Sequence, residues 1–335
     1  MADRVSRAHL QRFLQALAVK FRWTGGIADI VCPRVPVENQ SDKYRVWGKD
    51  RFINRGSNAT KWTPGTAPNE IEMRWSEDNY FAELYKLRTK ILDTEQRNAD
   101  SDLTLSANAT EYVSLALEIG REARVAALFT AAGTYAASHK IAKAGGSEYD
   151  QAAVKATNQV VIDIDALISN IKPDAMCTSK DLTVVIPEPV WDQGIKRNQG
   201  ILDTIKYSEK GIVTLDLFTE LLGVKQTLLA SAVTASPAID QEAKDVVTGF
   251  TSAYTWGDTI WVGIVPEDAQ NQLQPAFARS FHWKKETAGQ DRQVRTYRDP
   301  DEGKECEWTE VKEAVGEKVQ FALAGGIITN ALSTI

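Results

Sequence analysis

The side chains best suited to catalysis or metal binding are few in this chain and lie far apart. The three histidines, His9, His139 and His282, fall in unrelated segments, and none belongs to an HExxH or a similarly spaced metal-binding set. The chain contains neither the GxSxG sequence of a nucleophile elbow nor the GxxxxGK(S/T) sequence of a phosphate-binding loop. The sequence therefore predicts no catalytic residue, no metal ligand and no cofactor site, and each histidine is expected to be structural or solvated.

The cysteines and one pair of aspartates are also expected to carry no chemistry. Cys32, Cys177 and Cys306 are too widely spaced for a CxxC metal site and too few for a disulfide framework, which favours a reducing cytoplasm. Asp163 and Asp165 alternate with isoleucines on an expected helix, so both are expected on its solvated face.

Composition places the chain among soluble globular proteins. Hydrophobic residues make up 43%, charged residues 25%, and the formal net charge is −6. The negative balance argues against a surface that binds nucleic acid throughout, although residues 1–34 carry a local net charge of +4. No apolar run approaches the ~20 residues of a membrane span, and residues 1–13 lack a signal-peptide core, so no membrane contact is expected.

The element that would organise these residues is a long helix within residues 100–132. Its predicted start lies at residues 108–110, and its expected buried face carries apolar residues at three- and four-residue steps: Tyr112, Ala116, Ile119, Ala123 and Ala126. Charged residues fill much of the remaining surface: Glu111, Glu118, Arg121, Glu122 and Arg124. The pattern predicts an amphipathic helix of about five turns, long enough to act as the spine of a domain.

Residues 36–99 have the pattern of an extended loop rather than a compact domain. Residues 71–75 alternate apolar and polar side chains as a half-buried strand does, and residues 44–47 are a plausible partner strand across a turn-rich stretch. The first arm carries a net charge of +3 and the second −4, which favours pairing within one hairpin or across subunits. Residues 80–91 fit a helix and a strand equally well.

The order and texture of these segments resemble those of tailed-phage major capsid proteins, the Hong Kong 97-like family. YKLRTKILDTEQRNADSDLTL is similar to the segment that enters the family's spine helix, and AALFTAAGTYAASHKIAKAGG to the turn that follows it. VVIPEPVWDQGIKRNQGILDTIKYS is similar to a core strand followed by a helix. The resemblance covers residues 27–332 and rests on segment order, with no single sharp motif.

The resemblance implies an α+β fold with an N-terminal arm, an extended two-stranded loop, a peripheral domain and an axial domain. The expected ranges are 1–35 for the arm, 36–99 for the loop, 100–210 for the peripheral domain with a spine helix at about 109–131, and 211–315 for the axial domain. Residues 316–335 would return to the peripheral-domain sheet.

Within these ranges the sequence predicts several individual elements. Residues 6–22 should form an arm helix, which either packs on a neighbour or presents a basic inner face to DNA. A second long helix should end near Pro173, followed by a buried strand at 182–186 and a helix at 188–206. Thr214 should cap a helix that ends at Gly223, and strands are expected at 224–230, 259–265, 278–284, 294–298 and 319–323.

The implied function is that of a major capsid protein, a non-enzyme that assembles into pentamers and hexamers and encloses phage DNA in an icosahedral head. Expected partners are other copies of the chain, the packaged double-stranded DNA, and separate scaffolding, portal and decoration proteins. Expected interface residues are the loop's tryptophans and charges: Arg45, Trp47, Lys49, Trp62, Glu70, Glu72 and Trp75.

Three questions stay open on the sequence alone. An encapsulin-type compartment would share the fold, and an unrelated mixed-fold enzyme could use a carboxylate site. Some family members also join a loop lysine to a neighbour's asparagine. Lys43, Lys49 and Lys61 lie in the loop, but no partner carboxylate is identifiable, so no crosslinking residue is assigned.

Overall fold

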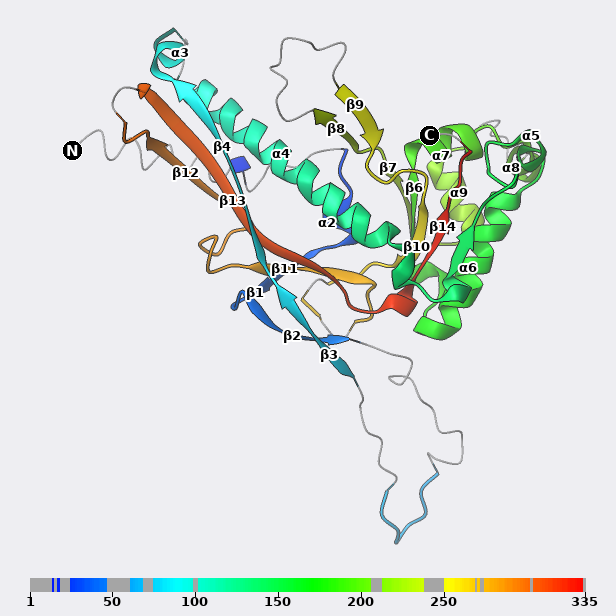
Figure 1. The fold of residues 1–335 in the computed structure, drawn as a ribbon. Helices are drawn as coiled ribbons and strands as arrows, with labels where there is room; N and C mark the ends of the chain where they lie inside the picture. Colours follow the sequence, from blue (N-terminus) through cyan, green and yellow to red (C-terminus); the bar gives the residue numbers. More distant parts are fainter. Residues whose placement is uncertain are drawn as a thin grey trace.

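In the computed structural model, a long helix crosses one sheet and ends beside a second (Figure 1). The structure describes residues 14, 17–18, 25–46, 61–68, 75–98, 102–205, 213–237, 250–268, 270–271, 274–301 and 304–333. Within these ranges no helix is both long and apolar enough to cross a membrane.

The predicted spine helix is present as α4, Asp102–Thr130. It begins before the predicted start, and its buried face is rotated from the predicted one. Tyr112 is 69% exposed, whereas the neighbouring Val113, together with Leu117 and Phe129, is buried. Glu118, Arg121 and Glu122, assigned to the polar side, are buried as well. Ala126 of the predicted stripe is buried, as expected. The rest of the prediction was wrong because it treated every charged residue as exposed, whereas Glu118 and Arg121 are buried beside oppositely charged partners.

The first sheet lies along the spine helix. Its path is β1 (Arg34–Val37), β11 (Ala278–Trp283), β13 (Cys306–Val319) and β12 (Gln293–Arg298), and β4 (Glu83–Leu92) also pairs with β13. β4 and β13 run antiparallel from Cys306↔Leu92 to Val315↔Glu83. The strands predicted at 278–284 and 294–298 are confirmed, and residues 83–92 are strand rather than helix. The strand predicted at 319–323 is wrong, because β13 ends at Val319 and a 3-10 turn, Ala322–Ala324, follows.

The second sheet has the order β5 (Lys140–Ala142), β14 (Gly325–Thr329), β10 (Ile260–Ile264), β6 (Leu182–Pro187) and β7 (Gln226–Ala230). Every residue of β6 and β10 is buried, as expected of short apolar runs. The strands predicted at 182–186, 224–230 and 259–265 are confirmed. β6 and β7 are hydrogen-bonded neighbours, so this sheet joins strands from both sides of residue 210, where the sequence analysis placed a domain boundary.

Helices cover the second sheet (Figure 1). The second long helix is α6, Gln159–Ala175, with Pro173 in its last turn, and the short α5 (Ala152–Lys155) precedes it. The single helix predicted at 188–206 is instead α7 (Glu188–Val190), a wide turn at Trp191–Ile195 and α8 (Gln199–Ile205).

The helix predicted between Thr214 and Gly223 is confirmed with both of its ends. It is α9, Leu215–Leu222. The Leu217 N–H donates to the Thr214 hydroxyl, and Gly223 ends the helix at φ 61°, a conformation that glycine adopts without strain.

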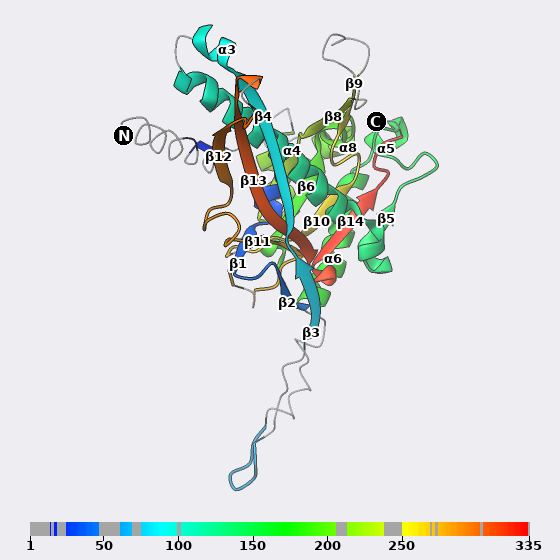
Figure 2. The same cartoon turned by 60° about the vertical axis from the view of Figure 1, so that its left-hand side comes forward.

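Two hairpins lie outside the main sheets. The first pairs β2 (Ser41–Val46) with β3 (Ser76–Phe81), and β3 leads into β4 with only Ala82 between them (Figure 2). The second pairs β8 (Val233–Pro237) with β9 (Phe250–Tyr254). Residues 71–74 of the strand predicted at 71–75 lie outside the described residues, and so does most of the arm helix predicted at 6–22; residues 14, 17 and 18 are helical. The remaining short helices are α2 (Ala28–Val31) and α3 (Asp93–Asn98).

Candidate functional site: the projecting hairpin and the charged network

Of the three histidines considered first for chemistry, His139 and His282 have structural surroundings, and His9 lies outside the described residues. His139 is buried, with Nδ1 3.1 Å from the Gly325 carbonyl oxygen and Nε2 3.2 Å from an Asp174 carboxylate oxygen. His282 is buried with Nε2 2.9 Å from the Thr287 hydroxyl, and burial lowers its pKa. Among the residues that the structure describes, no three His, Cys, Asp or Glu side chains are grouped so as to hold a metal ion. The three cysteines are free thiols.

Asp163 and Asp165 differ in environment. Asp165 is exposed, as predicted, but Asp163 is only 7% exposed, so its assignment to the solvated face was wrong. Its carboxylate pairs with Lys143 and accepts hydrogen bonds from Tyr149 at 2.8 Å and from Gln159 at 3.0 Å. Lys143 and Tyr149 precede α6, and Gln159 is its first residue. Asp163 therefore links the helix to the preceding segment.

Where the structure describes the extended loop, part of the predicted charge split is paired within one hairpin, and the other charges of the two arms, at 47–60 and 69–74, lie outside the described residues. Lys43 of β2 pairs with Glu77 of β3 at 3.0 Å, and Arg45 lies directly opposite Glu77 in the register. The Tyr44 hydroxyl donates to Asp78 at 3.1 Å. Because Lys43 and Glu77 are largely exposed, this pair adds little stability, on the order of 0.5 kcal/mol, and mainly sets the strand register.

The base of this hairpin is anchored on the first sheet by aromatic packing. Tyr80 stacks on Phe281 of β11 with ring centroids 4.5 Å apart, and Tyr44 lies 5.2 Å from the same ring. Together with Val35 they form a small buried cluster. This packing fixes the base of the hairpin, β2 and β3, on the first sheet (Figure 1).

Beyond this anchor the described loop residues expose aromatic surface. Trp62 is 55% exposed, and its indole N–H donates to the Thr66 carbonyl at 2.8 Å. Trp75 is 40% exposed, with the Arg45 guanidinium 4.4 Å from its ring centroid. The structure thus brings two of the predicted interface residues, Arg45 and Trp75, together. The other predicted residues, Trp47, Lys49, Glu70 and Glu72, lie outside the described residues.

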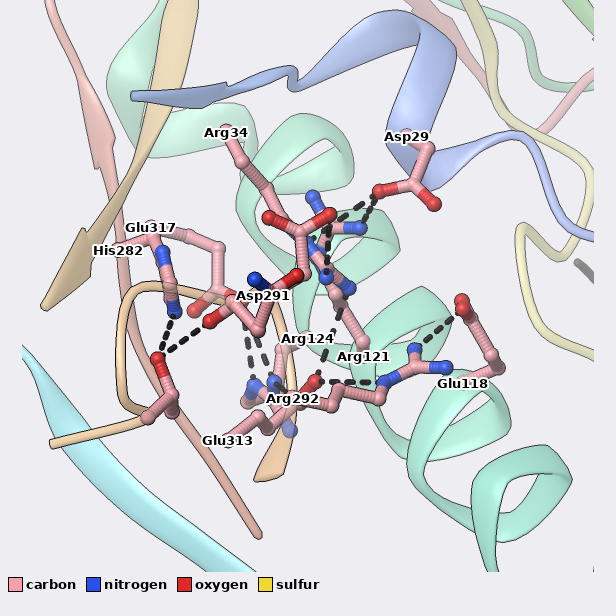
Figure 3. A network of polar contacts seen from close by, with 12 residues as sticks. Asp29, Arg34, Glu118, Arg121, Arg124, His282, Asp291, Arg292, Glu313 and Glu317 are labelled. Carbon is pink, nitrogen blue, oxygen red and sulfur yellow. Dashed lines mark hydrogen bonds and ion pairs between the residues drawn. The ribbon is translucent and has the colours of Figure 1, made fainter. Parts of the chain in front are cut away.

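A network of paired charges joins the spine helix to the first sheet and to residues 27–34 (Figure 3). Arg121 of α4 is fully buried; it pairs with Asp29 and donates to the Cys32 carbonyl at 2.9 Å. Burial lowers the pKa of Arg121 to about 10, against the opposing effect of nearby carboxylates, so the side chain is still cationic at neutral pH.

Glu313 of β13 is the centre of this network. Its carboxylate is fully buried and lies 3.2 Å from Arg124, 3.5 Å from Arg292 and 3.6 Å from Arg34. Burial by itself would raise the pKa of Glu313, but the surrounding guanidiniums outweigh burial and lower the pKa below its ordinary value. The carboxylate is therefore ionised in the folded protein.

Arg124 connects the helix to both long strands. Its guanidinium lies 3.6 Å from the Tyr85 ring centroid on β4 and 3.3 Å from Glu317 on β13. Arg292, which precedes β12, also pairs with Glu118 of α4. The central turns of the spine helix thus contact the first sheet through ion pairs between side chains. An apolar cluster lies on each side of these turns along the helix.

Glu122 fixes the N-terminal segment from the same helix. Its carboxylate accepts hydrogen bonds from the backbone N–H groups of Ile27 at 2.9 Å and Ala28 at 2.7 Å, at the start of α2. The Trp256 indole donates to the other oxygen at 2.7 Å. Burial raises the pKa of Glu122, and these three hydrogen bonds oppose that rise.

The sequence analysis did not predict this network. The only local signal was the group Glu118, Arg121, Glu122 and Arg124 on adjacent turns of one helix, and such a group is usually exposed. The partners Asp29, Arg34, Arg292 and Glu313 come from three distant segments, so their meeting could be seen only in the fold.

No family model matches the chain. Among curated proteins, it is similar to the major capsid protein of Pseudomonas phage JBD67, with 25% identity over 222 residues that make up 65% of this chain and 67% of that protein. Among solved structures, it is similar to a phage-related protein from Bordetella bronchiseptica RB50, with a TM-score of 0.73 and 18% identity over 96% of each chain. It is also similar to the capsid of cyanophage P-SCSP1u, with a TM-score of 0.57, 11% identity and coverage of 92% of this chain and 88% of that chain. The two structural matches cover 96% and 92% of this chain, so the similarity is one of the whole fold.

Proposed function

We propose that this protein, which has the Hong Kong 97-like capsid fold, is the major capsid protein of a phage and builds the shell of its head. The resemblance seen in the sequence to tailed-phage major capsid proteins is confirmed by the curated relative and by the solved structures. The observation that carries the proposal is the end-to-end match to a phage-related protein, joined to a relative named as a major capsid protein. The role is structural and calls for no catalytic residue or cofactor.

The projecting hairpin is the proposed contact with a neighbouring subunit. Its base is fixed by Tyr44 and Tyr80 on Phe281, while Trp62 and Trp75 expose aromatic surface beyond the base. Aromatic residues provide much of the binding energy at the centre of protein interfaces. Burial against a neighbour is proposed for the loop's seven interface residues: Arg45, Trp47, Lys49, Trp62, Glu70, Glu72 and Trp75.

The proposed division into domains follows the two sheets and differs from the predicted ranges, which put α6 and β6 in the peripheral domain and returned residues 316–335 to its sheet. The first sheet and α4 would form the peripheral domain, and the second sheet with α6 and α9 the axial domain around the capsomer axes. The pairing of β6 with β7 supports assigning residues 182–187 and 226–230 to the same domain. Pentamers and hexamers built in this way would close an icosahedral shell.

Other partners and the place of action belong to the same proposal. The shell would enclose double-stranded DNA, contacted without sequence specificity at its inner face, and the +4 charge of residues 1–34 suits such a contact. Separate scaffolding, portal and decoration proteins would complete the head. The subunit would be made in the cytoplasm of a bacterial host and act in the virion.

The two alternatives are not favoured. An encapsulin-type compartment would have the same fold, but the curated relative is a phage capsid protein. A mixed-fold enzyme would need a site with converging functional groups, and the fold match to capsids gives no support to one.

Negative-stain microscopy of the expressed protein tests the proposal. Uniform hollow shells or capsomer rings are expected, alone or with a co-expressed scaffolding protein. A protein that stays monomeric under all these conditions would contradict the proposal. Mass spectrometry of purified native particles separates the shared-fold alternative: DNA and portal protein are expected, and a cargo enzyme in their place would indicate a compartment.

A further inference from the structure

The carboxylate of Asp163, on α6 beside the second sheet, holds an amine and a carboxamide at the same time. Its Oδ2 atom pairs with the Lys143 ammonium group and accepts the Tyr149 hydroxyl at 2.8 Å. Its Oδ1 atom accepts the side-chain amide of Gln159 at 3.0 Å. One carboxylate thus bridges the lysine nitrogen and the glutamine nitrogen.

These groups lie in a site that holds little water. Lys143 and Asp163 are each only 7% exposed, and Tyr149 is fully buried. Lysine is rarely buried to this degree. The Lys143 Nζ atom lies 5.1 Å from the centroid of the Tyr149 ring. Burial, together with the Asp163 carboxylate, raises the pKa of Tyr149, so its hydroxyl keeps its proton and donates it in the hydrogen bond to Asp163.

The backbone holds the amine and the amide in place from two separate segments. Lys143 follows β5, and its backbone N–H donates to the Thr329 carbonyl of β14 at 3.0 Å. Gln159 is the first residue of α6, and Asp163 lies one turn later on the same face of that helix. The sheet therefore positions the lysine, and the helix positions both the amide and the carboxylate.

We propose that Lys143 and Gln159 become joined by an isopeptide bond within one subunit, in a reaction that the folded chain performs on itself with Asp163 as the carrier of protons. A buried lysine amine is a nucleophile, and a carboxylate in contact with both reacting groups can move protons between them. Holding the two groups together makes the attack intramolecular, and excluding water protects the amine from solvation. The bond would tie the edge of the second sheet to the start of α6.

The reaction balances without any further reactant. The Lys143 ammonium group gives one proton to Oδ2 of Asp163, and the neutral amine attacks Cδ of Gln159 to form the new N–C bond. Asp163 delivers its proton to Nε2, the bond between Cδ and Nε2 breaks, and ammonia leaves. The surplus proton on the new amide nitrogen passes through Asp163 to the ammonia, which departs as ammonium. Asp163 is again a carboxylate, and no atom is oxidised or reduced.

Mass spectrometry of the denatured, intact subunit tests the proposal. The unchanged protein should weigh one ammonia less than its sequence, and tandem mass spectrometry of a digest should find a branched peptide that joins Lys143 to Gln159. Lys143→Arg keeps the cation beside Asp163 but cannot form the bond, so it should have the full sequence mass. Asp163→Asn should also have the full mass, because it removes the carrier of protons. Circular dichroism checks folding, and should Asp163→Asn fail to fold, Gln159→Ala takes its place.

Lys312→Arg is the matched control. Lys312 is also paired with a carboxylate, that of Glu286 at 2.6 Å, but lies in the first sheet, so this change should leave the loss of ammonia and the branched peptide intact. The full sequence mass in the unchanged protein would overturn the proposal and leave Lys143 and Asp163 as an ion pair only. A loss of ammonia that persists in Lys143→Arg would overturn it as well and assign the loss to another side chain. Neither outcome depends on shell assembly, so the result is independent of the proposed function.

Discussion

At the residue scale, Glu313 is the central carboxylate of the charged network. Its buried carboxylate is approached by Arg34, Arg124 and Arg292 (Figure 3). Removing one member of such a group costs more free energy of folding than the intact ion pairs contribute, because it leaves buried charges without compensation.

Replacing Glu313 with Gln should therefore destabilise the unassembled subunit by about 3–5 kcal/mol, measured by chemical denaturation. Glu286→Gln is the matched control. Glu286 pairs with Lys312 at 2.6 Å but is one-third exposed, so its loss should cost under about 1 kcal/mol. Equal, small losses in both variants would show that the network adds no stability.

The same carboxylate predicts an acid dependence. The folded-state pKa of Glu313 is below its ordinary value of about 4.5, so its contribution is fully present above pH 4.5. It is lost as pH falls from there through the lower, folded-state pKa. Between these limits, stability should fall less steeply with pH in Glu313→Gln than in the unchanged protein. Parallel pH profiles would mean that Glu313 does not carry this dependence.

At the element scale, the elements predicted well were those whose signals are local. α9 was predicted with both ends because a capping hydroxyl, an apolar stripe and a glycine stop lie within ten residues. β13 was missed because Glu310, Lys312, Glu313 and Glu317 obscure its alternation. The three glutamates are buried beside arginines and a lysine from other segments, and no local pattern reveals these partners. The buried face of α4 was misassigned for the same reason.

The projecting hairpin gives the prediction at this scale. Trp75→Ala, or Glu70→Lys with Glu72→Lys, should sharply reduce shell formation, because each tryptophan buried in an interface can contribute on the order of 2 kcal/mol. Circular dichroism of the subunit should hardly change, since Trp75 is 40% exposed and lies outside the anchoring cluster. Tyr80→Ala is the contrasting variant, because Tyr80 is part of that cluster and should destabilise the subunit itself. If Trp75→Ala unfolded the subunit, and the protein that did fold assembled normally, the loop would belong to the subunit's own core.

At the scale of the whole molecule, the spine helix joins two units through different kinds of contact. Apolar clusters hold it to the first sheet near one end and to the second-sheet core near the other. The charged network holds it between them and also fixes residues 27–34. The spine could be predicted from segment order, whereas residues 83–92, assigned to the extended loop, form a strand of the first sheet. The relation of the two sheets could not, since the second sheet collects strands from residues 140 to 329.

Cryo-electron microscopy of assembled particles tests the central claim most directly. We expect closed icosahedral shells of pentamers and hexamers, in which the loop between β2 and β3 lies on an adjacent subunit. A soluble monomer or a small closed oligomer under every assembly condition would contradict the claim that this chain is a shell protein.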